Sequence, residues 1–360
     1  MNVVLDNIIF SLQKSGGASV VWQQHLQRLL QDPAFACYLI EYDTAEANLF
    51  RKQLQIDKED IEDRSSKFLN LKRYLDVKLN DNEKHIFHSS HYRLNKAKSA
   101  LNITTVHDFT YEYFVSGIRQ KVHTYQKNNS ILGAEAIICV SENTKKDLIK
   151  FIPQADASKI HVIYNGVDEG FRPVNKNESI EHPFGWREYI LYVGDRRTPY
   201  KNFGFAVECC AQAGYPLLMI GGGQLTEAEV NLLDSKLGNG NFKALQNVRV
   251  EDLNLYYNGA YCLLYLSLYE GFGIPVVEAQ KAGCPVITFN SSSLPEVAAN
   301  KHLMIAKPDA VDVVNLLKEL SRNSKFREET IEMGFLKAGQ FNWDKTYLQT
   351  SELYKNIYNE

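Results

Sequence analysis

The chain has 360 residues, of which 44% are hydrophobic and 23% are charged, as in an ordinary soluble globular protein. This length predicts two domains, each with a core of its own. The formal net charge of −3, from 40 basic and 43 acidic residues, gives no field that would favour nucleic acid as a partner. We find no secretory signal and no apolar stretch of the roughly 20 residues that span a bilayer. None of the six cysteines forms a Cys-x-x-Cys pair, which favours reduced thiols and a cytoplasmic location.

The first half of the chain alternates segments of strand and helix character. Strands are predicted at 3–10, 35–42, 86–89, 103–106, 136–140 and 160–164. Helices are predicted at 20–30, 118–132 and 143–152, with Ser141 as the N-cap of the last. The polar stretch 45–83 shows no clear periodicity and predicts surface helices and loops.

Residues 165–186 are rich in Gly, Pro, Asn and charge, which predicts a linker between domains. A second alternating series follows, with strands predicted at 189–193, 217–220, 248–250, 261–267 and 285–289. Helices are predicted at 203–213, 253–260, 276–282, 310–321 and 341–358. The repeated alternation indicates two Rossmann-like, doubly wound α/β domains. We therefore expect domains at 1–168 and 187–340, a linker at 169–186 and a C-terminal helix within 341–360.

The segment from Glu270 to Glu278 is the most informative part of the chain. Gly271 and Gly273 permit a tight turn after a buried strand, and Pro275 suits the start of a helix. The amides at that helix end favour an anion, and Glu278 lies about one turn inside the helix. Both carboxylates can then reach one crevice and serve a ligand with hydroxyls at two places and a phosphate between them. A glutamate in a first helical turn can also simply complement the helix dipole.

The wider segment 269–297, with Ala282-Gly283-Cys284-Pro285 and Ser293-Leu294-Pro295-Glu296-Val297, resembles the signature of family 4 glycosyltransferases, group 1 type. In that family two glutamates separated by seven residues contact the donor sugar and the nucleotide ribose. The resemblance implies the two-domain GT-B fold, in which a C-terminal helix crosses back to the first domain. It assigns Glu270 to the sugar hydroxyls and Glu278 to the ribose, with the amides of Gly271, Phe272, Gly273 and Ile274 beside the diphosphate.

A basic loop follows the strand predicted at 189–193. Arg196 and Lys201 are suited to neutralise a diphosphate leaving group, since such loops lie at the ligand-binding edge of a parallel sheet. The loop also resembles the family's phosphate-binding loop, and either Arg196 or Arg197 can take the place of its arginine. Alternatively, these charged residues only lie in a loop that is exposed to solvent.

Two further segments of the second half complete the expected donor site. Gly221 ends the next predicted strand and is expected to turn tightly beside the nucleotide. Val250 matches the position at which the family holds the base by its backbone, which leaves the choice between guanine and uracil open. Asp252 is expected to be a helix N-cap and not a ligand.

The first domain contributes two candidates. Gly16 and Gly17, in the loop after the first strand, can bring amides close to a phosphate or sugar, and they resemble the family's N-terminal loop. His107 follows the strand 103–106 and resembles the histidine that contacts the donor sugar or the acceptor. Asp108 could orient it, although a histidine in such a place is often only structural.

The resemblance implies a retaining, metal-independent hexosyltransferase that takes a nucleotide-diphosphate sugar and needs no cofactor. GDP-mannose is the favoured donor and a UDP-sugar the next. The acceptor is expected to be a glycan or lipid-linked saccharide of bacterial surface polysaccharide assembly. A phosphorylase or nucleotide-sugar epimerase on the same fold remains an alternative, as does a non-catalytic sugar-nucleotide binding protein. No Asp-x-Asp motif and no His/Cys spacing of a zinc site occurs.

The stretch 67–78 bears on the location of the protein. Its basic residues Lys67, Lys72, Arg73 and Lys78 are interleaved with Phe68, Leu69, Leu71, Tyr74 and Leu75. This pattern is compatible with peripheral contact with the inner face of the cell membrane. It is equally typical of a surface helix whose lysines extend along apolar neighbours.

Overall fold

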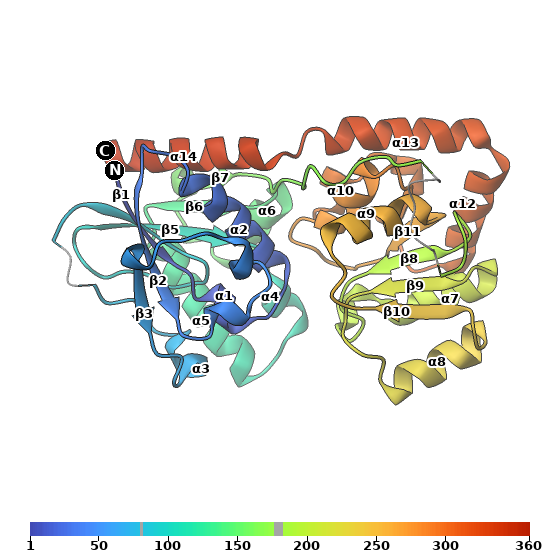
Figure 1. Ribbon diagram of the computed structural model, residues 1–360, viewed down its shortest axis with the longest axis horizontal. Helices are drawn as coiled ribbons and strands as arrows, with labels where there is room; N and C mark the ends of the chain where they lie inside the picture. The colour runs from blue at the N-terminus through green and yellow to red at the C-terminus, as the bar shows by residue number, and fades with distance from the viewer. Residues whose placement is uncertain (80–81, 176–182) are drawn as a thin grey trace. The chain divides into compact units, whose positions relative to one another are not determined.

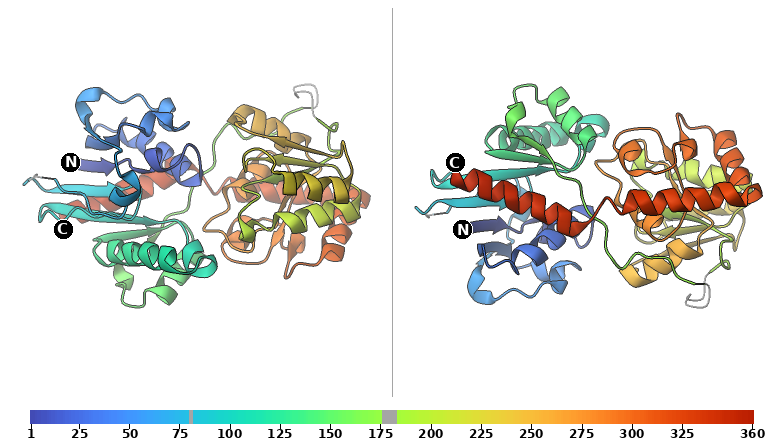
Figure 2. Two further views of the ribbon diagram at one scale, coloured as in Figure 1. Left: turned by 90° about the horizontal axis from the view of Figure 1, so that it is seen from below. Right: turned by 90° about the horizontal axis from the view of Figure 1, so that it is seen from above.

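The computed structural model describes residues 1–79, 82–175 and 183–360, and it divides into two compact units. Unit 1 comprises Met1–Gly166 and Trp343–Glu360, and unit 2 comprises Val167–Asn342. Each unit holds one parallel sheet with helices on both faces, which is the doubly wound α/β architecture that the alternating pattern predicts (Figures 1 and 2). Among the described residues, no helix is both long enough and apolar enough to cross a bilayer.

The described strands of unit 1 form a seven-stranded sheet in the order β3-β2-β1-β4-β5-β6-β7. The strands are β1 Asn2–Asp6, β2 Ala36–Tyr42, β3 Ile61–Arg64, β4 His85–Ser89, β5 Ala100–Val106, β6 Ala136–Cys139 and β7 Ile160–Val162. The helices are α1 Ile9–Leu12, α2 Gly17–Leu29, α3 Leu69–Lys72, α4 Thr110–Phe114, α5 Ile118–Leu132, α6 Glu142–Phe151 and α14 Trp343–Asn359. Nearly every residue of β1, β4 and β6 is buried, as expected for strands covered on both faces.

The described strands of unit 2 form a six-stranded sheet in the order β10-β9-β8-β11-β12-β13. The strands are β8 Ile190–Val193, β9 Leu217–Ile220, β10 Phe242–Leu245, β11 Cys262–Tyr265, β12 Val286–Phe289 and β13 Met304–Ile305. The helices are α7 Phe203–Ala213, α8 Glu227–Leu237, α9 Val250–Gly259, α10 Ile274–Lys281, α11 Leu294–Val297, α12 Ala310–Arg322 and α13 Ser324–Ala338. Strand order reverses between β8 and β11, so we expect the loops after these two strands to diverge and to leave a crevice at their carboxyl ends.

Helix α14 ends the chain and is part of unit 1. It packs along α2, where Arg28 pairs with Asp344 at 2.6 Å and the Tyr354 hydroxyl lies 2.9 Å from Nε2 of His25. The chain leaves unit 1 after Gly166, and the first and last residues of unit 2, Val167 and Asn342, pair in a parallel bridge. The C-terminal helix expected at 341–358 is therefore present, beginning at Trp343.

Two predicted strands are wrong. The strand predicted at 3–10 ends at Asp6, and Ile9–Leu12 forms a short helix. Because Ile9 and Phe10 are buried like the strand residues, the apolar sequence does not show where the strand ends and the helix begins. The strand predicted at 248–250 is the start of a helix, since Val250 opens α9. The real strand β10 is partly exposed and was not predicted, and neither were α8 and α13.

The structure also tests three other predictions, one of which falls partly outside the described residues. Ser141 is the N-cap of α6, and its hydroxyl accepts a hydrogen bond from the amide of Thr144 at 3.0 Å. The prediction of surface helices and loops for the stretch 45–83 is wrong in one part, because Ile61–Arg64 forms strand β3 at the edge of the sheet; its other described elements, α3 among them, are short helices. The middle of the expected linker, residues 176–182, lies outside the described residues.

Candidate active site

The crevice of unit 2 brings together the two charged residues that the sequence analysis placed on different loops. Lys201 lies in the loop after β8, and Glu270 lies in the loop after β11. The Lys201 ammonium donates a hydrogen bond to Oε1 of Glu270 at 2.5 Å and lies 3.3 Å from the Tyr265 hydroxyl. Both side chains are largely shielded, with 16% and 12% of their surface exposed. A partly desolvated ion pair therefore stands where a parallel sheet binds ligands.

Two serines after β12 fix the turn that carries Glu270. The Ser292 hydroxyl accepts a hydrogen bond from the Glu270 amide at 3.0 Å. The Ser293 hydroxyl lies 2.9 Å from the carbonyl of Glu270 and 3.0 Å from that of Phe272. Gly273 adopts φ of 102°, and a Cβ there would lie 3.1 Å from Leu294, so the turn requires glycine. The sequence analysis missed Ser292, and a polar residue directly after a buried strand was the available signal.

Glu278 lies in α10 beyond this turn and has a different environment. The Tyr257 hydroxyl, from α9, donates a hydrogen bond to its Oε2 at 2.8 Å. Burial, with a smaller contribution from the charge of Asp168, raises the pKa of Glu278 to about 7, although the Tyr257 bond opposes the shift. The two glutamates thus differ: Glu270 is paired with a cation, whereas Glu278 is held by a neutral phenol.

Arg196 is buried beneath the neighbouring loop. Its guanidinium pairs with Glu229 of α8 at 2.9 Å and donates to the carbonyls of Gly221, Gly222 and Gly223. These glycines have φ of 95°, 71° and 70°, a left-handed conformation that only glycine adopts easily, and this directs their carbonyls to Arg196. Arg196 therefore organises the loop that Gly221 begins.

Arg197 reaches the same loop from a more exposed position. Half of its side chain is exposed, and its guanidinium donates to the carbonyl of Gln224 at 2.5 Å and lies 3.9 Å from the Glu229 carboxylate. The two arginines thus differ in exposure: Arg196 is buried among protein partners, whereas Arg197 is half exposed.

The start of α9 differs from expectation in its cap. Val250 is the first residue of the helix, and Arg249 occupies the N-cap position. Asp252, expected to be the N-cap, lies inside the first turn and pairs with Arg249 at 2.9 Å. Asn247, with φ of 52°, makes the turn that leads into the helix. The apolar pattern Val-Arg-Val at 248–250 had suggested a strand there.

In unit 1, Gly16 and Gly17 stand at the start of α2. Gly16 is the N-cap, and a Cβ there would lie 2.5 Å from Oε1 of Gln13, whereas Gly17 faces open space. The Gln13 side chain donates to Ser19 at 2.8 Å, and Asn48 donates to the Gln13 carbonyl at 2.8 Å. The loop is therefore held from its inner side, and one of its glycines is open to a ligand.

His107 follows β5 in unit 1 and is partly buried. Burial lowers the pKa of His107, and the charge of Lys127 lowers it further while that of Asp108 opposes the shift, so the imidazole is neutral at pH 7. Lys127 is buried; it donates to the Asp108 carbonyl at 3.0 Å and to Glu112 at 2.8 Å. His107 also lines a cavity of about 40 Å³ with His25, His88 and Thr105.

Comparisons with known proteins bear on the fold and the family of the chain. Among solved structures, the chain is similar to sucrose-phosphate synthase from Thermosynechococcus elongatus, with a TM-score of 0.77, 15% identity and coverage of 100% of this chain and 99% of the other. It is also similar to HepE of Anabaena in complex with UDP and glucose, with a TM-score of 0.73, 14% identity and coverage of 99% and 100%. The two parallel-sheet units and this likeness confirm the fold of the GT-B glycosyltransferases.

Sequence comparisons define the family. The model of glycosyl transferases group 1 matches residues 175–336, and that of Glycosyltransferase Family 4 matches residues 16–171. The chain belongs to this family, as the segment 269–297 predicted. It is 28% identical over 297 residues to O-antigen chain mannosyltransferase B of Escherichia coli, covering 77% of this chain and 76% of that protein. It is also 28% identical over 232 residues to O-antigen chain mannosyltransferase RfbU of Salmonella typhimurium, covering 61% of this chain and 60% of that protein.

Proposed function

We propose that this protein is a retaining, metal-independent mannosyltransferase that takes GDP-mannose and extends a glycan or lipid-linked acceptor. The paired Lys201 and Glu270 at the crevice of unit 2 carry the proposal, because they offer a cation to a leaving diphosphate and a carboxylate to sugar hydroxyls. Mannose is favoured because two relatives similar to this chain are named mannosyltransferases. A UDP-sugar is the second candidate, since UDP and glucose occupy the similar HepE structure.

Lys201 is proposed to stabilise the negative charge that builds up on the diphosphate as the bond to the sugar breaks. An ammonium has three donors, so Lys201 can keep its bond to Glu270 and donate to a phosphate oxygen at the same time. The helix end at Ile274 adds its dipole to this stabilisation, and so do the amides that the Gly271–Gly273 turn presents. Arg197, which is half exposed, is the arginine that we expect at the diphosphate.

Glu270 and Glu278 are proposed to bind the two sugars of the donor. Glu270, paired with Lys201, accepts from hydroxyls of the transferred sugar. Glu278, at the second turn of α10, accepts from the ribose, and the backbone at Val250 lies by the base. Gly16, Gly17 and His107 are proposed to serve the donor sugar or acceptor from unit 1.

In the proposed reaction, the acceptor hydroxyl attacks the anomeric carbon on the face from which the diphosphate leaves. The carbon–oxygen bond to the diphosphate breaks, the bond to the acceptor oxygen forms, and a diphosphate oxygen takes the acceptor proton. No covalent sugar–enzyme intermediate is required, and Glu270 is not assigned as a nucleophile.

The decisive test is a screen of GDP, UDP, ADP and TDP sugars in the presence of EDTA. Thermal stabilisation by one nucleotide sugar, and slow release of its nucleotide, are expected. Transfer to a mannose-terminated oligosaccharide should then give a product with the anomeric configuration of the donor, as read by NMR. Conversion of the donor without an acceptor would indicate an epimerase, a requirement for free phosphate would indicate a phosphorylase, and binding without turnover would indicate a binding protein.

A further inference from the structure

Unit 1 exposes large apolar side chains on two segments that the donor site does not use. In the segment around α3, Phe68, Leu71 and Leu75 are 67%, 66% and 60% exposed. On α5, Ile118, Val122 and Tyr125 are 82%, 41% and 75% exposed. Their spacing of four and three residues places the α5 side chains on one helix face, opposite the buried His123 and Lys127. We call these six residues the apolar patch.

The two segments are neighbours. The Gln126 side chain of α5 donates a hydrogen bond to the carbonyl of Arg73, at the end of α3. Figure 1 shows both helices at the lower edge of unit 1. The six side chains thus come from two adjacent pieces of one surface and not from opposite sides of the unit.

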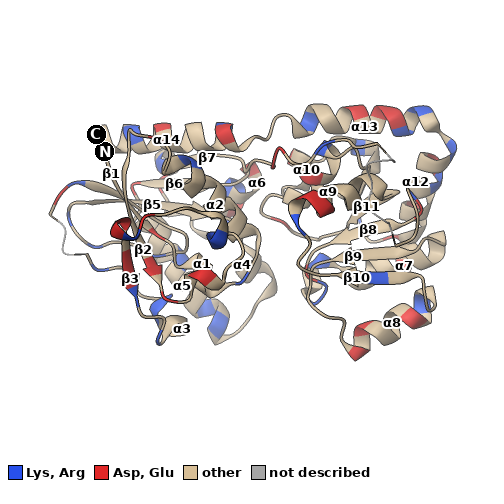
Figure 3. Cartoon of the chain, in the orientation of Figure 1, with Lys and Arg blue, Asp and Glu red and all other residues tan. Residues whose placement is uncertain are grey.

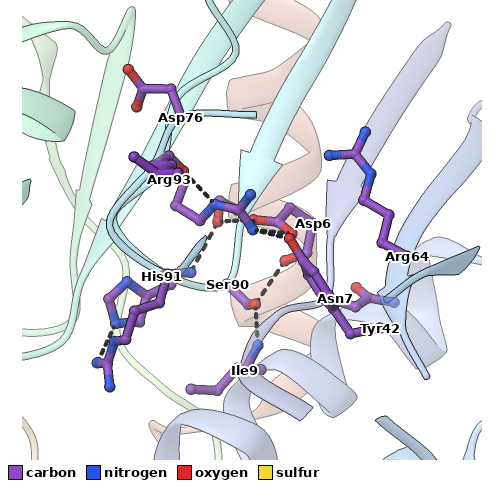
Figure 4. A network of polar contacts seen from close by, with 12 residues as sticks. Asp6, Asn7, Ile9, Tyr42, Arg64, Asp76, Ser90, His91 and Arg93 are labelled. Atoms are coloured by element: carbon purple, nitrogen blue, oxygen red, sulfur yellow. Dashed lines mark hydrogen bonds and ion pairs between the residues drawn. The ribbon is translucent and has the colours of Figure 1, made fainter. Parts of the chain in front are cut away.

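Buried groups hold the first segment in place from within. Arg93 donates to the Leu75 carbonyl at 2.9 Å, and its guanidinium pairs at 3.1 Å with both oxygens of Asp6, which is fully buried (Figure 4). The Val77 amide donates to the Leu94 carbonyl at 2.8 Å. The backbone at Leu75 and Val77 is therefore held in place by a buried ion pair and by a hydrogen bond to Leu94.

Phe68 adds a second sign that the exposure is built into the fold. Its φ of 62° is left-handed, a conformation that costs a non-glycine residue about 1 kcal/mol. The phenyl ring nevertheless remains exposed, with the Lys67 ammonium 5.5 Å from its centre. A strained backbone that directs an aromatic ring to solvent points to a role for the ring outside the folded core.

Basic residues predominate around the patch, although Asp76 follows Leu75 and Asp43 accepts a hydrogen bond from the Ser66 amide at 3.0 Å. Residues 65–75 and α5 contain no acidic residue, although the whole chain has a net charge of −3 (Figure 3). Arg73 turns inward to His91, and Lys127 turns inward to Glu112. The basic residues left around the patch are Lys67, Lys72, Arg119 and Lys121.

We propose that the apolar patch and its basic rim dock unit 1 on the surface of an anionic lipid bilayer. Apolar side chains bordered by lysine and arginine match the interface, where they enter the acyl boundary while the cations meet lipid phosphates. A second copy of the chain is disfavoured, because it would bring two basic rims together. The proposal refines the expectation for 67–78: Leu69 and Arg73 face inward, and α5 supplies half of the surface. It does not depend on the proposed reaction.

The test is flotation of the full chain with vesicles of phosphatidylcholine alone or mixed equally with phosphatidylglycerol. Binding is expected only to the anionic vesicles and should fall steeply with salt. Phe68→Ser/Leu71→Ser/Leu75→Ser and, separately, Ile118→Ser/Tyr125→Ser should each reduce the bound fraction about tenfold or more. Lys67→Glu/Lys121→Glu should reduce it similarly.

The matched control is Leu336→Ser/Leu348→Ser, which removes two leucines that are 76% and 63% exposed elsewhere on the chain and should float as the unchanged protein does. Unaltered flotation of the patch variants, or no binding of the unchanged chain, overturns the proposal. The proposal is also overturned if analytical ultracentrifugation shows a dimer of the unchanged chain that the patch variants no longer form. A second copy of the chain would then cover the patch. Nucleotide-sugar stabilisation, measured on each variant, reports the fold and tests the proposed function separately.

Discussion

At the scale of single residues, the site combines charges whose surroundings differ sharply. Lys201 and Glu270 come from loops 69 positions apart and meet because β8 and β11 are adjacent at the point where the strand order reverses. Glu278 pairs with no cation in the part of the chain that the structure describes, and it is held by Tyr257. Sequence reasoning found all three residues through their loops and the family signature. It could not find Tyr257 or Tyr265, because a tyrosine in an apolar run looks like core.

The ammonium of Lys201 should be indispensable to turnover. Lys201→Ala is expected to lower kcat/KM about a thousandfold, or about 4 kcal/mol of transition-state stabilisation, because the charge on the leaving diphosphate then lacks its nearest cation. Steady-state kinetics with the donor found in the screen measures the loss. Lys236→Ala is the control, since it removes an ion pair with Glu208 on the surface, at 2.7 Å, and should leave the rate unchanged. A Lys201→Ala enzyme with full activity would contradict the site.

Glu278 should make donor binding depend on pH near neutrality. Its pKa of about 7 in the folded protein, against 4.5 as the ordinary value, means that the carboxylate is lost as pH falls below 7. The proposed hydrogen bond from ribose is stronger to a carboxylate than to a neutral carboxyl, so the donor Kd should rise from pH 8 to pH 6 by isothermal titration calorimetry. Glu278→Gln should bind more weakly at pH 8 and show a flatter pH profile.

The same carboxyl has the opposite effect on stability. A folded pKa above the unfolded value stabilises the fold fully below pH 4.5, and the contribution disappears as pH rises through 7. The melting temperature of Glu278→Gln relative to the unchanged protein should therefore rise between pH 5 and pH 7.5. Glu328→Gln, at an exposed position of α13, should show no such trend. Parallel trends in both variants would mean that Glu278 is not the titrating group.

At the scale of elements, the strongly apolar central strands were predictable and the edges were not. β8, β9, β11 and β12 are buried throughout or nearly so, and their apolar runs identified them. β10 lies at the sheet edge, and its sequence Phe-Lys-Ala-Leu is too short and too exposed to stand out. The helix at Val250 was mistaken for a strand because its cap is an arginine, which carries none of the usual N-cap signals.

The turn after β9 should depend on Arg196 as a structural residue. Arg196→Ala leaves Glu229 with only the more distant Arg197, at 3.9 Å, and frees three glycine carbonyls, so a loss of about 3 kcal/mol in the free energy of unfolding is expected. Arg196→Lys should recover little, because an ammonium cannot span the carboxylate and the carbonyls as the guanidinium does. Chemical denaturation measures both variants.

Arg197→Ala is the matched comparison for that experiment. Its side chain is half exposed, so stability should stay within about 0.5 kcal/mol while the donor KM rises. If Arg196→Ala were as stable as the unchanged protein and only raised the donor KM, the assignment of the two arginines would be reversed.

At the scale of the whole molecule, the chain builds unit 1 from both of its ends. The repeated strand–helix alternation predicted two doubly wound units, and the GT-B fold of the structural neighbours confirms that class. What the alternation could not reveal is how α14 is attached. The Tyr354 hydroxyl stands between His25 of α2 and His88 of β4, and His88 reaches Thr105 at 2.9 Å with its other nitrogen. No local pattern links residues so far apart in sequence.

This polar attachment should make unit 1 sensitive to acid. Burial lowers the pKa of His25 from 6.5 to about 4, with a smaller contribution from Arg28, and burial also lowers the pKa of His88. Because the unfolded histidines take up protons first, their contribution to stability is complete above pH 6.5 and is lost as pH falls through 4. Calorimetry from pH 7.5 to pH 4.5 should show a falling melting temperature, with fluorescence reporting through Trp22, whose ring lies 5.0 Å from His88.

Tyr354→Phe separates this mechanism from general acid unfolding. The variant removes one hydroxyl between two buried imidazoles and should cost about 1–3 kcal/mol at pH 7.5, since both ring nitrogens lose a partner. His25→Gln should flatten the decline in melting temperature below pH 6.5, because the group that takes up the proton is gone, whereas His302→Gln, at an exposed position, should leave the decline unchanged. An equally steep decline in His25→Gln would place the acid sensitivity in groups other than His25.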